Sequence, residues 1–156
     1  MIRINNDWEF VFSWTDGFGR GEGAGEAVRL PHTVKELPLH CADSADYETV
    51  SGYRRRLAVP KEAEGQRVFL QFDGAAHIAT VYLNGYKLAT HRCGYTAFRV
   101  EITEYVSCGE DNLLAVKLDS TENPAIPPFG LFDRLFDLRR AVPGRLAGHP
   151  PAKADL

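Results

Sequence analysis

The sequence has little cysteine, no long apolar run and no excess of positive charge. The cysteines Cys41, Cys93 and Cys108 are odd in number and lack the spacing of metal ligands, so we expect three mostly buried thiols in a reducing cytoplasm. No apolar segment approaches the length of a membrane span, and the first residues lack the apolar stretch of a secretion signal. The formal net charge of -3 indicates no basic surface for nucleic acid. These absences predict a cytoplasmic protein with neither a membrane nor a nucleic-acid partner.

What is present is the composition of an ordinary globular domain. The chain has 156 residues, of which 44% are hydrophobic and 25% are charged. This length suffices for one domain with its own core. The histidines His40, His77 and His91 share no ligand spacing with each other or with the cysteines. We therefore expect no metal and no cofactor.

Short runs with alternating apolar residues dominate the chain up to Ser120. The clearest are residues 8–12, 50–59, 67–72, 78–83, 98–102 and 113–118. Such runs, bounded by turn residues and without any long amphipathic helix, predict an all-β jelly-roll sandwich. The glycine-rich segment from Gly17 to Gly25 predicts a mobile loop.

Turn residues and charge refine this prediction. Asn84-Gly85 stands between two alternating runs and predicts a tight hairpin, because both turn residues must accept a positive φ. Residues 50–59 place Arg54 and Arg56 on one face. We expect that face to be wet, with arginine serving solubility; the alternative is an arginine that pairs with a carboxylate outside this chain.

The order of several short motifs resembles one protein family. The motifs are Leu-Pro-His at 30–32, Ser-Gly-Tyr-Arg-Arg at 51–55, Phe-Asp-Gly-Ala at 72–75, Val-Tyr-Leu-Asn-Gly at 81–85, Gly-Tyr-Thr-Ala-Phe at 94–98 and Gly-Glu-Asp-Asn at 109–112. Over about residues 8 to 130 this order is similar to the sugar-binding domain of glycoside hydrolase family 2, which includes β-galactosidase, β-glucuronidase and β-mannosidase. Residues 30–39 and 127–130 look most like the β-galactosidase branch.

The resemblance implies that this domain has no catalytic residue of its own. Members of the family are retaining glycosidases, which need two carboxyl groups about 5–5.5 Å apart. In the family both are glutamates on a barrel that follows this domain, and we expect the barrel to lie beyond this chain. The implied partner is a carbohydrate of the β-galactoside type, bound through the missing barrel. Contacts between subunits of a homo-oligomer are compatible with the same role.

The resemblance also indicates which loops reach the sugar. In the family this domain lends a loop to the rim of the active site, and the two candidate loops are residues 41–50 and the segment after the strand at 113–118. We predict Asp46, Asp119 and Asn123 as substrate-binding residues. The alternative for each is an ordinary solvated loop residue. Neither loop contains tryptophan, which argues against strong sugar binding by the isolated domain.

The last part of the chain, residues 131–156, predicts an irregular tail. Pro143, Gly144, Gly148, Pro150 and Pro151 break any regular element there. Back-translation of residues 131–146 with a slip of one nucleotide permits the run S-I-D-Y-L-T-Y-G-G-L-Y-R, which is the motif expected in the family at this place. We therefore hypothesise a frameshift at about residue 131. A genuine disordered or helical tail is the alternative.

Two other functional classes remain open at this point. A free-standing carbohydrate-binding module would bind a galactoside without any barrel. A protein-interaction β-sandwich would expose an apolar surface and dimerise or aggregate.

Overall fold

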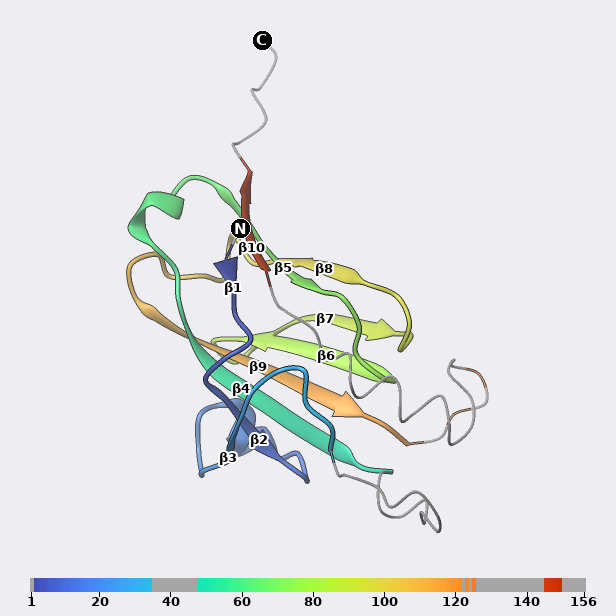
Figure 1. The fold of residues 1–156 in the computed structure, drawn as a ribbon. Coiled ribbons are helices and arrows are strands. Elements are labelled where there is room, and N and C mark those ends of the chain that lie inside the picture. The colour runs from blue at the N-terminus through green and yellow to red at the C-terminus, as the bar shows by residue number, and fades with distance from the viewer. Residues whose placement is uncertain (1, 35–47, 122, 124, 126–144, 150–156) are drawn as a thin grey trace.

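The computed structural model describes residues 2–34, 48–121, 123, 125 and 145–149, and in these parts it is a sandwich of two antiparallel sheets (Figure 1). One sheet has six strands in the order β3-β2-β4-β9-β6-β7, and the other has four in the order β1-β10-β5-β8. The strands are β1 (Ile2–Arg3), β2 (Trp8–Val11), β3 (Glu26–Val28), β4 (Val50–Ala58), β5 (Arg67–Phe72), β6 (Ile78–Leu83), β7 (Tyr86–Arg92), β8 (Phe98–Glu101), β9 (Asp111–Asp119) and β10 (Arg145–His149). This arrangement confirms the all-β jelly-roll prediction.

The core lies between the two sheets and follows the alternation of the sequence. On β5 the side chains of Val68, Leu70 and Phe72 are buried, and on β6 those of Val81 and Leu83 are buried. Alternate residues of a strand point to one face, so β5 and β6 each contribute every second side chain to the core. Trp8 is also buried there, with its indole Nε1 donating to the carbonyl of Ile4 at 2.6 Å.

The predicted hairpin between β6 and β7 is confirmed. Asn84 and Gly85 adopt φ values of 51° and 84°, the positive values that a tight hairpin turn needs. The Asn84 side chain binds a second element, because its Nδ2 donates to Oδ1 of Asn112 at 2.9 Å and its Oδ1 accepts from the Leu113 amide. The hairpin turn is therefore joined to the start of β9.

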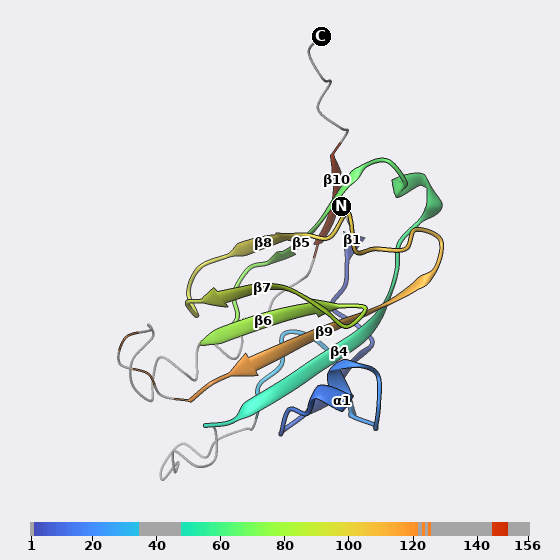
Figure 2. The same ribbon diagram turned by 180° about the vertical axis from the view of Figure 1, so that it is seen from behind.

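The prediction of a loop from Gly17 to Gly25 is wrong for residues 17–19, which are helical, and right for residues 20–25. This segment includes most of a short helix, α1 (Asp16–Gly19), which Thr15 caps by accepting from the Phe18 amide. Phe18 is buried. Figure 2 shows α1 against β4, on the side of the six-stranded sheet away from the other sheet. A glycine-rich composition shows that a chain can turn, but not that one aromatic side chain within it is buried against a distant strand.

The prediction that Arg54 lies on a wet face is also wrong. Its side chain is 8% exposed and forms a salt bridge with Glu9. The predicted alternation of β4 is correct, because Tyr53 points into the core and Arg54 points to the opposite face of the sheet. The α1 segment, by which we mean residues 16–25, covers that outer face at Arg54. Arg56, two residues further along β4, is exposed.

A strand occurs within the segment that the sequence assigns to an irregular tail. β10 lies between β1 and β5, with Leu146 opposite Leu70 and Gly148 opposite Val68. Strand pairing uses main-chain groups, so it leaves the question of the reading frame open.

Two further expectations concern thiols and membranes. Cys93 and Cys108 are half-buried rather than buried, and Cys41 lies outside the described residues. Within the described ranges, no helix has the length and apolar character to cross a membrane.

Candidate functional site

The two loops predicted to reach a sugar begin side by side at one end of the sandwich. Val50 at the start of β4 is opposite Asp119 at the end of β9. One residue further out, the Ser120 amide donates to the Thr49 carbonyl at 2.9 Å, and the Thr49 amide donates to Oγ of Ser120 at 3.2 Å. Any side chains carried by these two loops therefore start from a common, hydrogen-bonded base.

Two of the three predicted site residues can be placed at this end. Asp119 accepts with Oδ1 from the amide of Thr121 at 3.0 Å and from its hydroxyl at 2.6 Å. Asn123 accepts with Oδ1 from the Ala125 amide at 2.9 Å. One oxygen of each side chain is thus used to shape its own loop, as Asp and Asn commonly do in turns. Asp46 lies outside the described residues.

His77 lies beside this base, which the sequence did not indicate. It follows a cis peptide bond from Ala76, its side chain is 2% exposed, and its amide donates to the Asp119 carbonyl at 3.1 Å. The spacing of His77 in the sequence bears only on metal binding, for which it is unsuited. Within the described residues, no three His, Cys, Asp or Glu side chains gather closely enough to hold a metal ion.

His32 is joined to Tyr53 by a side-chain hydrogen bond. Its Nδ1 lies 3.0 Å from the hydroxyl of Tyr53, and its ring centroid is 4.8 Å from that of Phe10. Burial lowers the pKa of His32, and the nearby Glu26 partly opposes this. Burial also raises the pKa of the Tyr53 hydroxyl. Both groups are therefore held neutral, which suits a structural hydrogen bond rather than proton transfer.

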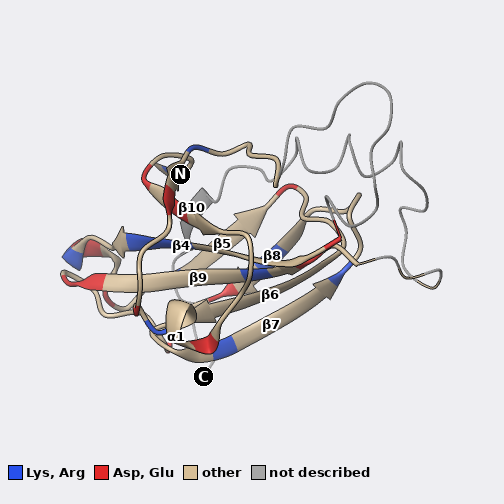
Figure 3. Cartoon of the chain, turned by 90° about the horizontal axis from the view of Figure 1, so that it is seen from below, with Lys and Arg blue, Asp and Glu red and all other residues tan. Residues whose placement is uncertain are grey.

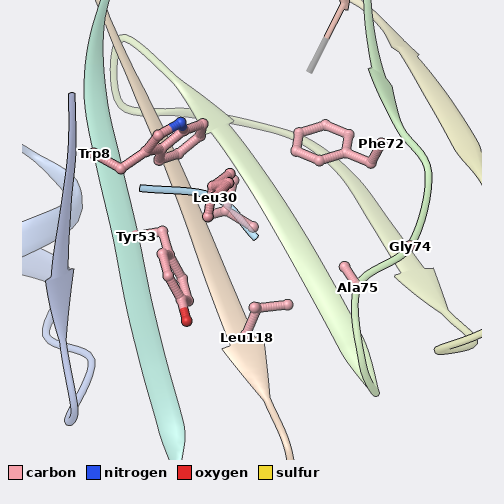
Figure 4. Close-up of a pocket in the computed structure, with 8 residues that line it drawn as sticks. Trp8, Leu30, Tyr53, Phe72, Gly74, Ala75 and Leu118 are labelled. Carbon is pink, nitrogen blue, oxygen red and sulfur yellow. The ribbon is translucent and has the colours of Figure 1, made fainter. Parts of the chain in front are cut away.

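A small cavity lies beside Tyr53, between the sheets. Figure 4 shows Trp8 and Tyr53 from the six-stranded sheet, Phe72 from the four-stranded sheet and Leu30 from the loop after β3 around this cavity. Its volume is about 20 Å³ and its lining is almost wholly apolar. Such a space holds about one water molecule and offers few polar partners. It is a packing defect of the core and has no room for a sugar.

We call the end of the sandwich where Thr49 meets Ser120 the loop end. The two-layer fold and this loop end define a galactose-binding-domain-like β-sandwich. Residues 37–127 match the family described as glycosyl hydrolase 2 galactose-binding domain-like. The chain belongs to this family.

Similar proteins include enzymes of two activities. The chain is 37% identical over 134 residues to a β-galactosidase of Thermoanaerobacter pseudethanolicus, a match that covers 83% of the chain and 18% of that protein. It is also 37% identical over 128 residues to a β-glucuronidase of Bacteroides fragilis, covering 81% of the chain and 18% of that protein. The crystal structure of a β-glucuronidase from Bacteroides uniformis superposes with a TM-score of 0.70 at 27% identity, over 83% of the chain and 16% of that structure. The chain thus spans less than a fifth of the length of these relatives.

Proposed function

We propose that this chain is the non-catalytic domain of a retaining β-glycosidase of the β-galactosidase type, acting in carbohydrate metabolism. The observation that carries the proposal is the extent of the match, since the chain aligns with 18% of a β-galactosidase and 18% of a β-glucuronidase. The two carboxyl groups of a retaining glycosidase must flank one sugar. The family resemblance assigns both to a barrel that would follow this domain.

In the intact enzyme the loop end would border the sugar pocket. The shared base at Thr49 and Ser120 supports this role, because it directs both candidate loops from the same end of the sandwich. Asp119 and Asn123 would each use one oxygen for the loop turn. Their remaining polar atoms would then be available to sugar hydroxyl groups. The rest of the sandwich would serve as a scaffold for the barrel.

The first test separates catalysis from binding. We expect the 156-residue chain to release no nitrophenol from nitrophenyl β-galactoside or β-glucuronide above a buffer blank. Turnover that scales with protein concentration would contradict the non-catalytic role.

The second test addresses the loop end within the intact enzyme. Asp119→Asn keeps the oxygen that accepts from Thr121 but removes the charge, and Asn123→Asp is its counterpart. We expect each to raise KM for a galactoside by roughly tenfold, the usual effect of one lost hydrogen bond to a charged or polar partner. Glu62→Gln is the matched control, because Glu62 is exposed in the short helix that follows β4 at its opposite end. Unchanged KM in both loop variants would refute the contact.

A further inference from the structure

A concave site lies on the outer face of the six-stranded sheet, away from the loop end. It is a hollow of about 270 Å³ between the α1 segment and the turn of the β6–β7 hairpin. Figure 3 shows α1 in front of the strands on this face. The residues that line the hollow are Trp14, Asp16, Gly19, Arg20, Tyr82 and Gly85.

Two aromatic side chains form the wall of this hollow, and they are held rigidly. The rings of Trp14 and Tyr82 are stacked with their centroids 5.5 Å apart and an interplanar angle of 21°. The indole is seated between two glycines, because a Cβ at Gly19 or Gly52 would lie 2.7 Å from its ring atoms. Both aromatic residues nevertheless keep part of their surface exposed. A ligand would meet a preformed surface and would bear little of the entropic cost of ordering it.

Polar groups of both signs converge on the same hollow. Asp16 accepts from Trp14 Nε1 at 3.2 Å, and it is exposed, as is Arg20 four residues further along the chain. Burial raises the pKa of the Tyr82 hydroxyl, and the negative charge of Asp16 adds to this effect. Asp16 and Tyr82 both line the hollow. An acceptor, a guanidinium donor and a phenolic hydroxyl thus border one aromatic wall.

We propose that this hollow binds a single pyranose ring of a glycan. A pyranose has an apolar face that packs on aromatic rings and an equatorial rim of hydroxyl groups that needs both donors and acceptors. The hollow supplies both kinds of contact. Its volume is just under the roughly 300–1,000 Å³ of pockets for drug-sized ligands, which suits one ring rather than an oligosaccharide. Packing of Trp14 against glycine accounts for the seating of the indole, but it does not require Asp16 and Arg20 at its open edge.

This site is separate from the loop end and goes beyond the proposed function. Tyr82 is opposite Ala115 on β9, four residues along that strand from Asp119. At about 3.3 Å per residue the two places are roughly 13 Å apart along the strand. Neither Asp119 nor Asn123 lines the hollow.

The two tryptophans make a site-specific test within the 156-residue chain. In a ¹⁵N-labelled sample each indole N–H gives its own resonance, and Trp8, which is 2% exposed, is an internal control. We expect methyl β-galactopyranoside, titrated to tens of millimolar, to shift the Trp14 resonance saturably and leave that of Trp8 in place. Glucitol, an acyclic polyol, should shift neither. No shift at Trp14, or equal shifts at both indoles, would overturn the proposal.

Variants that keep the Trp14 and Tyr82 rings test which polar side chains contact the sugar. We expect Arg20→Ala and Asp16→Asn each to raise the Kd for the glycoside roughly tenfold. Arg99→Ala, which removes an exposed arginine from β8 in the other sheet, should leave the Kd unchanged. Tyr82→Phe keeps the ring and tests the hydroxyl alone. Unweakened binding in both the Arg20 and the Asp16 variants would refute the assigned site.

Two outcomes distinguish this inference from the proposed function. If Asp119→Asn abolishes the Trp14 shift, the two sites are one and the inference fails while the loop-end contact stands. If the Trp14 resonance moves on dilution of the protein without sugar, the hollow is a contact between copies of the chain and the inference likewise fails. A Trp14 titration that is unchanged in the Asp119 variant supports an independent site.

Discussion

Arg54 on β4 donates from Nε to Oε2 of Glu9 on β2 at 2.8 Å, and these two residues are direct partners in the register of the two strands. The same guanidinium donates to the carbonyls of Phe18, Glu22 and Gly23, and it lies 4.2 Å above the centroid of the Phe18 ring. A single arginine therefore joins the α1 segment to the outer face of the sheet. This connection therefore holds α1 in place, and Asp16 and Gly19 of α1 line the hollow beside Trp14.

We expect Arg54→Ala to lower the free energy of unfolding by about 3 kcal/mol, because it removes a buried guanidinium that makes several hydrogen bonds. The loss should come from three carbonyls and one carboxylate that lose their donor. Lysine should rescue little, because one ammonium cannot reproduce the fork of the guanidinium. Urea unfolding of Arg54→Ala and Arg54→Lys would measure both effects.

Arg56→Ala is the matched control for this experiment. Arg56 is an exposed arginine of the same strand, and its removal should change the free energy of unfolding by about 0.5 kcal/mol or less. Equal losses in the Arg54 and Arg56 variants would contradict the role assigned to Arg54.

Asn112 is the second buried polar anchor. It is fully buried, and its Nδ2 donates to the carbonyls of Ser107 and Glu110 while its Oδ1 accepts from the Ser107 amide and from Asn84. Asn112→Asp preserves the shape but removes the donor and adds a buried charge. We expect a loss of about 2–4 kcal/mol in the free energy of unfolding, measured by thermal and urea unfolding. The same change at exposed Asn6 should have little effect, and similar losses at both positions would count against the network.

His32 should make stability depend on pH in a predictable direction. Burial lowers its pKa in the folded state below the ordinary value of 6.5. The unfolded chain therefore takes up a proton first as the pH falls, and the folded state loses stability from about pH 6.5 down to the lowered pKa. Above that window the neutral ring contributes its full hydrogen bond to Tyr53.

Unfolding free energies at pH 7.5 and pH 5.5 test this direction. In His32→Asn an amide replaces the imidazole near Tyr53 and no longer titrates, so we expect it to reduce the loss of stability between the two pH values. A variant with the same pH dependence as the parent would show that other groups are responsible.

The reading frame after residue 131 is settled by the nucleotide sequence. The slip of one nucleotide within residues 131–146 permits the run S-I-D-Y-L-T-Y-G-G-L-Y-R, which is the motif that the family resemblance implies at this place. We expect the gene, sequenced through this region, to continue in the shifted frame into a long open reading frame with a barrel and paired glutamates. Early stop codons in that frame would refute the frameshift.

Much of the fold is encoded locally. The alternation of β5 and β6, and the positive φ that Asn84-Gly85 accepts, depend on neighbours a few residues apart, so the pattern of residue types was sufficient to predict them. The ordered family motifs likewise indicated the jelly roll and the two loops at its end. Strand alternation separates two faces, however, and does not state which of them a further segment will cover.

The sequence by itself determined most of the strands before residue 120, the hairpin, the family and the faces of β4, but not β10. Only the tertiary structure decided that Arg54 is buried and that Thr49 meets Ser120, 71 residues away along the chain. The same holds for the stacking of Trp14 on Tyr82. The physical reason is that these contacts join segments whose separation along the chain carries no periodic signal. Their positions follow from how the two sheets and the α1 segment pack together.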